Sequence, residues 1–197
     1  VNGKQTDLFI LKNKQGNEVA VTNYGGAVVA IMMPDKDGNY ANLIQGHDNI
    51  QDVINSPEPF LSVLIGRYGN RIKEGKMTIV NLTHHGFFSI QGIANPTPTI
   101  DNIICEVNAD YYLPIDEVSI PTGEILKVEG TPFDFRTPKP IGQDIDADDE
   151  QIKNGQGYDH NYVLNKKEEG ELSFAARIKD PASCRTMEVY TTEPGLQ

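Results

Sequence analysis

The chain has 197 residues, with 17 Lys and Arg against 28 Asp and Glu, and a formal net charge of −11 at pH 7. This length allows one domain with a substantial hydrophobic core. The negative charge makes nucleic acid and anionic membrane surfaces unsuitable partners, because both repel an acidic protein, and no apolar run in the sequence is long enough to span a bilayer.

The first predicted element is a β-hairpin near the amino terminus. Phe9 and Leu11 lie at alternate positions, a Gly-containing turn follows at residues 13–17, and Val19 and Val21 alternate again. This period of two is typical of a strand, and the short loop between the two runs predicts that they pair.

A short helix is expected next, over residues 48–55, with Asp48 as its N-cap. Beyond it the alternation returns, and three further strand faces are expected: Ile103, Cys105, Val107 and Ala109; Leu172, Phe174, Ala176 and Ile178; and Met187 and Val189. The acidic stretch at residues 144–150 is interpreted as a solvated loop. Many short strands with 18 Gly and 12 Pro in the turns predict an all-β antiparallel sandwich.

The two cysteines, Cys105 and Cys184, are far apart and have no metal-ligand spacing. Both lie in strand-like stretches, so we expect two buried thiols rather than a disulfide. Cysteine usage therefore indicates neither a metal site nor a particular compartment.

A series of motifs occurs in order along the chain. The most specific are Ile65–Ile72, similar to a "GRYxNRI" signature, and Asn81–Phe88, similar to "NLTNHxYF". The others are Asn23–Gly26, Pro34–Gly38, Leu113–Asp116, Ile120–Ile125, Gly130–Arg136, Gly157–Tyr162 and Thr192–Gln197. Together these motifs cover nearly the whole chain and resemble the galactose mutarotases, or aldose 1-epimerases, of the bacterial type.

The resemblance implies a single large antiparallel β-sandwich domain over residues 1–197, with a sugar bound in an open cleft. It implies an isomerase that interconverts the α and β anomers of free aldohexoses such as galactose and glucose. The reaction needs no cofactor and no metal. A general base takes the proton of the anomeric hydroxyl while a general acid protonates the ring oxygen, so both groups must reach the sugar.

Carried over residue by residue, His85 matches the general acid of the family, a role that suits an imidazole because its pKa lies near the working pH. In the family, the position of the adjacent His84 is usually Asn. Because neighbouring strand residues face opposite ways, His85 rather than His84 is favoured as the acid. Arg71 and Asn70 match ligands of the sugar hydroxyls, and Asp159 matches the carboxylate that accepts hydrogen bonds from two of them. His160 is interpreted as structural.

The sequence departs from the family in two places. The resemblance puts the catalytic glutamate in a strand that would follow Gln197, so Glu193 is interpreted as structural or cleft-lining rather than as the base. A segment with an "LHGG"-like motif and a second active-site histidine is absent near residues 78–81. Loss of internal and terminal strands would expose apolar faces and unpaired edges. We therefore expect that residues are missing from the printed sequence rather than deleted from the protein.

Three alternatives accompany the mutarotase reading. A non-catalytic sugar-binding protein would keep the cleft without the base, a sugar-phosphate 1-epimerase would need a cationic phosphate site, and a β-sandwich could have an unrelated binding role. The expected partner is a monosaccharide. The sequence leaves open the preferred sugar, the oligomeric state, and whether the protein resides in the cytoplasm or the periplasm.

Overall fold

The computed structural model describes residue 1 and residues 3–66, 83–94 and 99–197. The chain separates into two compact units. The first comprises Val1–Asn70, Glu74–Pro98 and Ala182–Arg185, and the second comprises Arg71–Lys73, Thr99–Pro181 and Thr186–Gln197. The expectation of one domain remains a prediction, and the departure from the family near residues 78–81 lies outside the described residues.

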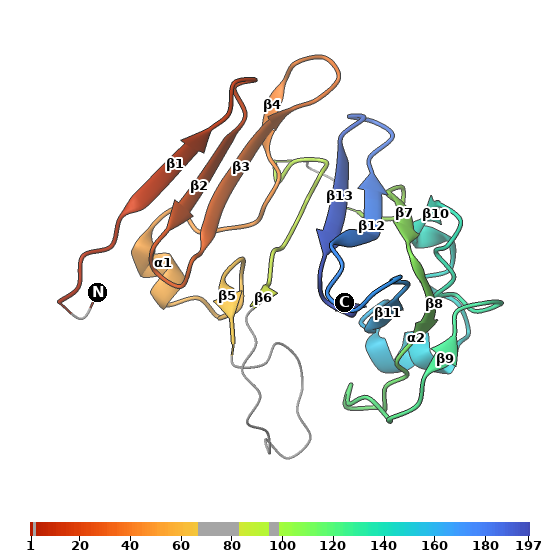
Figure 1. Cartoon of the computed structure of the whole chain (residues 1–197). Helices are drawn as coiled ribbons and strands as arrows, with labels where there is room; N and C mark the ends of the chain where they lie inside the picture. The colour runs from red at the N-terminus through yellow and green to blue at the C-terminus, as the bar shows by residue number, and fades with distance from the viewer. Residues whose placement is uncertain (2, 67–82, 95–98) are drawn as a thin grey trace. The chain divides into compact units, whose positions relative to one another are not determined.

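The first unit contains a four-stranded antiparallel sheet in the order β1-β2-β3-β4, which runs from red to orange in Figure 1. A two-stranded ribbon, β5-β6, follows it in the chain. The elements of this unit are β1 (Leu8–Lys12), β2 (Glu18–Thr22), β3 (Val28–Pro34), β4 (Tyr40–Asn42), α1 (Ile50–Ile54), β5 (Leu64–Ile65) and β6 (Thr83–His84).

The predicted amino-terminal hairpin is confirmed, with Phe9 opposite Val21 in the β1-β2 pair. Its loop is closed by Asn13, whose side-chain oxygen accepts hydrogen bonds from the backbone N–H groups of Gln15 and Asn17, each at 3.0 Å. An Asn side chain that caps its own turn in this way fixes the loop and therefore the strand register.

The predicted short helix is also confirmed as α1, but its N-cap is wrong. Asn49, not Asp48, has extended backbone angles, and its side chain accepts from the N–H groups of Gln51 and Asp52. Asn and Asp are almost equally good N-caps, so composition could not choose between two adjacent candidates.

The second unit contains two four-stranded antiparallel sheets, β10-β7-β12-β13 and β14-β11-β8-β9. Its elements are β7 (Ile104–Val107), β8 (Ala109–Tyr112), β9 (Leu126–Lys127), β10 (Lys139–Pro140), a 3-10 helix (Ile141–Gln143), α2 (Glu150–Gly155), β11 (Tyr162–Leu164), β12 (Ser173–Lys179), β13 (Thr186–Thr191) and β14 (Gly195–Leu196). Together with the sheet of the first unit, this confirms the predicted all-β antiparallel sandwich class.

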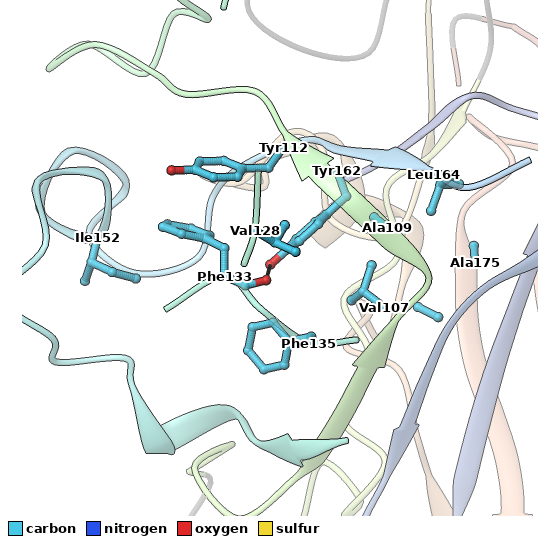
Figure 2. Packing of buried hydrophobic residues seen from close by; sticks show 11 residues of the cluster. Val107, Ala109, Tyr112, Val128, Phe133, Phe135, Ile152, Tyr162, Leu164 and Ala175 are labelled. Atoms are coloured by element: carbon cyan, nitrogen blue, oxygen red, sulfur yellow. Dashed lines mark hydrogen bonds between the residues drawn. The ribbon is translucent and has the colours of Figure 1, made fainter. Parts of the chain in front are cut away.

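The hydrophobic core of the second unit draws on both of its sheets. Figure 2 shows the ring of Tyr112 stacked on Phe133, with centroids 4.6 Å apart, and the hydroxyl of Tyr162 donating to the backbone oxygen of Phe133 at 3.1 Å. The fully buried residues Val128 and Ala175 complete the centre. A buried Tyr needs such a partner, because an unpaired hydroxyl in this core would be costly.

Asn108 joins the two sheets of this unit at the point where the chain passes from β7 to β8. Its side-chain amide donates to the backbone oxygens of Asn165, at 3.3 Å, and Phe174, at 3.2 Å. The polar contacts at Asn108 interrupt the single strand face expected over residues 103–109, although Ile103, Val107 and Ala109 are buried as predicted.

The strand face predicted over residues 172–178 is partly wrong. The register of β12 against β13 shifts between Phe174 and Ala176, so that Ala175 and Ala176 are both buried. Leu172 precedes the strand and is 67% exposed. A bulge inserts one residue and inverts the alternation beyond it, which a strict period of two cannot anticipate.

The acidic stretch at residues 144–150 is more ordered than the solvated loop that we expected. Asp149 is the N-cap of α2, and its side chain accepts from the N–H groups of Gln151, at 2.8 Å, and Ile152, at 3.2 Å. Asp144 binds the ammonium group of Lys139 at 2.7 Å. Negative charge at the start of a helix is stabilising.

Neither cysteine forms a disulfide, as predicted. Cys105 is partly buried and Cys184 is exposed, so the prediction that both thiols are buried is wrong for Cys184. In the described part of the chain, no helix has the length and apolar character required to cross a membrane.

Candidate functional site

His85 lies in the first unit directly after β6, and its side chain is exposed. The β5-β6 ribbon fixes its backbone, because Leu64 pairs with His84 and the N–H of His85 donates to the backbone oxygen of Val63 at 3.0 Å. The imidazole therefore lies at the end of a hydrogen-bonded ribbon, where a ligand from solvent can reach it.

Two aromatic rings flank this imidazole. The centroid of the Phe87 ring lies 5.0 Å from that of His85, and the centroid of Phe60 lies 6.2 Å away, both in tilted arrangements. Contacts of this kind restrict the rotation of the histidine side chain. A restrained ring suits a residue that must deliver a proton in a fixed direction.

The loop that carries His85 is braced by Ser62, which is fully buried. The Ser62 hydroxyl donates to the backbone oxygen of Gln45 at 2.6 Å and accepts from the N–H of Phe87 at 3.2 Å. Ser62 holds these contacts at a φ of 50°, in the left-handed region that is unfavourable for residues other than Gly. The side chain thus links three segments that are distant in sequence.

His84 is also exposed, but it differs from His85 in position, since it is the last residue of β6 and lies opposite Leu64. No aromatic contact is recorded for His84 among the described residues, whereas His85 has two. This difference favours His85 as the acid, and the assignment remains a proposal.

Asp159 lies in the second unit, in the turn between α2 and β11, and is partly buried. Its Oδ1 accepts a hydrogen bond from Nε2 of Gln197 at 2.5 Å. Gln197 reaches this position because β14 pairs with β11, with Leu196 opposite Tyr162. Gln197 lies in the Thr192–Gln197 motif, but the sequence alone indicates no role for it.

The turn that presents Asp159 is set by the end of α2. Gln156 adopts the left-handed conformation with a φ of 52°, and its N–H donates to the backbone oxygens of Ile152 and Lys153. Gly157 follows with a φ of 127°, which only Gly adopts easily. The chain therefore reverses within two residues of the helix end and enters β11 through Asp159 and His160.

The remaining predicted site residues are placed less fully. Asn70 and Arg71 lie outside the described residues. Glu193 is exposed in the turn before β14, and its N–H donates to the side chain of Thr191 at 3.0 Å. Within the described ranges, His, Cys, Asp and Glu side chains form no group of three or more that could hold a metal ion.

A groove of about 700 Å³ opens on the second unit beside α2. Its lining is rich in carboxylates and amides, contributed by Asp116, Glu117, Glu124, Asp149, Glu150, Gln151 and Asn154. Neither His85 nor Asp159 lines this groove, so it is not part of the candidate sugar site. Its carboxylates would repel a phosphate group.

Comparison with protein families shows that the sequence model of the family described as aldose 1-epimerase matches residues 7–79 and 73–197. Galactose mutarotase from Homo sapiens is 42% identical over 127 residues, covering 64% of this chain and 34% of that protein. Aldose 1-epimerase from Escherichia coli K12 is 39% identical over 118 residues, covering 60% of this chain and 33% of that protein. The chain thus spans about a third of the length of the curated relatives it matches.

Solved structures share the fold. A GalM/aldose epimerase homologue from C. elegans superposes with a TM-score of 0.77 and 17% identity, covering 97% of this chain and 80% of that one. Galactose 1-epimerase from Lactobacillus acidophilus gives a TM-score of 0.70 with 23% identity, covering 91% and 74%.

Proposed function

The chain belongs to the aldose 1-epimerase family, and on this premise we propose that the protein interconverts the α and β anomers of free aldohexoses such as galactose and glucose. The observation that best supports this activity is the exposed imidazole of His85, fixed through its backbone to Val63 and flanked by Phe60 and Phe87. An accessible histidine with a restrained ring is what a general acid requires.

In the proposed reaction His85, in its protonated form, gives its proton to the ring oxygen of the sugar. A general base removes the proton of the anomeric hydroxyl, the bond between C1 and the ring oxygen breaks, and the open-chain aldehyde forms. Rotation about the C1–C2 bond and reversal of the proton transfers close the ring on the other face. Each well-placed acid or base contributes on the order of a hundredfold or more.

Asp159 has the role of a sugar ligand in this proposal. Its carboxylate accepts hydrogen bonds from two sugar hydroxyls, and the hydrogen bond from Gln197 to Oδ1 holds it in one orientation. Arg71 and Asn70 are proposed as further ligands on the strength of the Ile65–Ile72 motif alone. We assign the general base to no described residue.

The activity is tested by polarimetry of freshly dissolved α-D-galactose and α-D-glucose, with a parallel binding titration. Methyl α-D-galactoside serves as a matched ligand, because its ring cannot open and it reports binding alone. The proposal predicts saturable binding of both ligands and faster optical-rotation change of the free sugars than in buffer.

Saturable binding without acceleration would instead support the non-catalytic sugar-binding protein. Tighter binding of glucose 6-phosphate than of glucose would support the sugar-phosphate epimerase, which the net charge of −11 disfavours. Absence of any sugar binding would contradict both the mutarotase activity and the non-catalytic sugar-binding function.

A further inference from the structure

His160 is a buried histidine that the proposed reaction does not use. It directly follows Asp159 and is only 2% exposed. Its ring lies against Phe133, with centroids 4.4 Å apart, and meets the edge of Tyr112 at 5.8 Å. There is little space around it, since a Cβ atom on Gly155 would lie 2.8 Å from its Cε1 atom. The imidazole therefore fits one position only.

Hydrogen bonding to Gln151 assigns the tautomer of this imidazole. Gln151 donates from its Nε2 to the backbone oxygen of Ile115 at 3.1 Å and accepts at Oε1 from the N–H of Ile115 at 2.7 Å, which fixes the orientation of its amide. The same Oε1 lies 3.1 Å from Nε2 of His160. Because an amide oxygen can only accept, Nε2 of His160 must carry the proton.

The other ring nitrogen, Nδ1, is buried and has no hydrogen-bond partner among the described residues. A second proton there would place an unpaired N–H and a positive charge in an apolar cluster, which is costly. Burial accordingly lowers the pKa of His160, although the carboxylates of Asp159 and Asp149 act in the opposite direction. The imidazole is thus neutral and donates through Nε2 alone.

This arrangement has a consequence for Asp159. An imidazolium at His160 would compete with sugar hydroxyls for the carboxylate of Asp159, whereas a neutral imidazole does not. Through Gln151 the same imidazole ties the turn at Asp159 to α2 and to the backbone of Ile115. The position of the carboxylate relative to Gln197 then depends on a hydrogen bond inside the core.

We propose that His160, as the neutral Nε2–H tautomer bonded to Gln151, is the positioning residue that holds Asp159 in its sugar-binding orientation. The inference rests on the proposed role of Asp159 as a sugar ligand. It concerns a residue that touches no substrate and acts only through the turn that it anchors.

Two variants of the same residue separate positioning from general support. In His160→Gln the terminal amide nitrogen takes the place of Nε2 and can still donate to Gln151, whereas in His160→Asn the amide reaches only the position of Nδ1. We expect His160→Asn to raise the KM or Kd for galactose about tenfold, the effect of one misplaced hydrogen bond to a charged group, with kcat changed less than about threefold. His160→Gln should restore the affinity to within about threefold of wild type.

Asn154→Ala supplies the matched control. The Asn154 side chain also donates to the backbone oxygen of Ile115, at 2.9 Å, but has no recorded contact with His160, so this variant should leave the affinity unchanged. Equal affinity in both His160 variants and wild type, with only a lower Tm, would mean that His160 is merely structural and would overturn the proposal. A rise in KM for Asn154→Ala as large as that for His160→Asn would overturn it as well.

Two NMR readouts need no sugar and separate this inference from the proposed function. Long-range 1H–15N spectra should show His160 at pH 7 with a proton on Nε2 and none on Nδ1; the reverse tautomer or an imidazolium would refute the inference even if the protein is an active mutarotase. The side-chain amide resonance of Gln197, which is bonded to Asp159, should shift in His160→Asn and not in Asn154→Ala.

Discussion

Gln197 donates a hydrogen bond from Nε2 to Oδ1 of Asp159 over 2.5 Å, joining two residues 38 positions apart in sequence. The contact depends on the pairing of β14 with β11, so the sheet itself brings the donor to the carboxylate. A neutral donor at this point orients Asp159 without cancelling its charge.

Replacing this donor by an acceptor should impair sugar binding. In Gln197→Glu two carboxylates would face each other, and their repulsion should displace Asp159 and raise the Kd for galactose about tenfold or more. Isothermal titration with galactose measures the change. Glu169→Gln, an exposed position in the turn between β11 and β12, is the control and should bind as wild type. Unchanged affinity in Gln197→Glu would show that Asp159 needs no orienting donor.

Ser62 offers a test of the loop that carries His85. Ser62→Ala leaves the backbone oxygen of Gln45 and the N–H of Phe87 without their partner, which should cost about 2–3 kcal/mol of unfolding free energy. Ser62→Gly loses the same contacts but relieves the strain of the positive φ, so it should be more stable than Ser62→Ala by about 1 kcal/mol. Urea denaturation gives both values, and the opposite order of the two variants would contradict this account.

Arg185 is buried in the first unit, and its guanidinium donates to backbone oxygens of Pro34, Asn39, Ile90 and Gln91 at 3.0–3.4 Å. Arg185→Met removes all of these donors and should destabilise the unit by about 3 kcal/mol. Arg185→Lys keeps the charge but lacks the planar fork, so it should recover only part of the loss. Thermal unfolding measures both; full recovery by Lys would show that charge alone matters.

The two thiols should differ in reactivity. Burial raises the pKa of Cys105 to about 11, so at pH 8 it is a protonated thiol, and the reactive thiolate forms only as the pH approaches 11. Cys184 is exposed. Iodoacetamide at pH 8, followed by mass spectrometry of peptides, should label Cys184 first and Cys105 only on unfolding. Faster labelling of Cys105 in the native protein would contradict its burial.

The sequence predicted the features that depend on local chemistry. The hairpin around Asn13 follows from alternation and turn residues, and the motifs identified the family. The helix near Asn49 was predicted with its N-cap one residue too early. The bulge before Ala176 and the exposure of Leu172 could not be predicted. Packing between strands determines where a single residue is inserted into a strand.

In the candidate site, too, the sequence indicates residues within motifs but not the contacts between distant segments. His85 and Asp159 are proposed from their motifs. The hydrogen bond from Phe87 to Ser62, which braces the loop of His85, joins segments 25 residues apart and involves a residue in the left-handed conformation. The bond between His160 and Gln151 likewise crosses from a turn to a helix. Such contacts are set by tertiary structure, which neither composition nor periodicity encodes.

The central claim, that His85 is the general acid of an aldose 1-epimerase, is tested most directly by comparing His85→Asn with His84→Asn in mutarotation of α-D-galactose. The two histidines are adjacent and both exposed, so each variant controls for the other. We predict that His85→Asn lowers kcat about a hundredfold or more, with little change in the Kd for methyl α-D-galactoside, and that His84→Asn changes either value less than about threefold. Loss of activity in His84→Asn with full activity in His85→Asn would contradict the account.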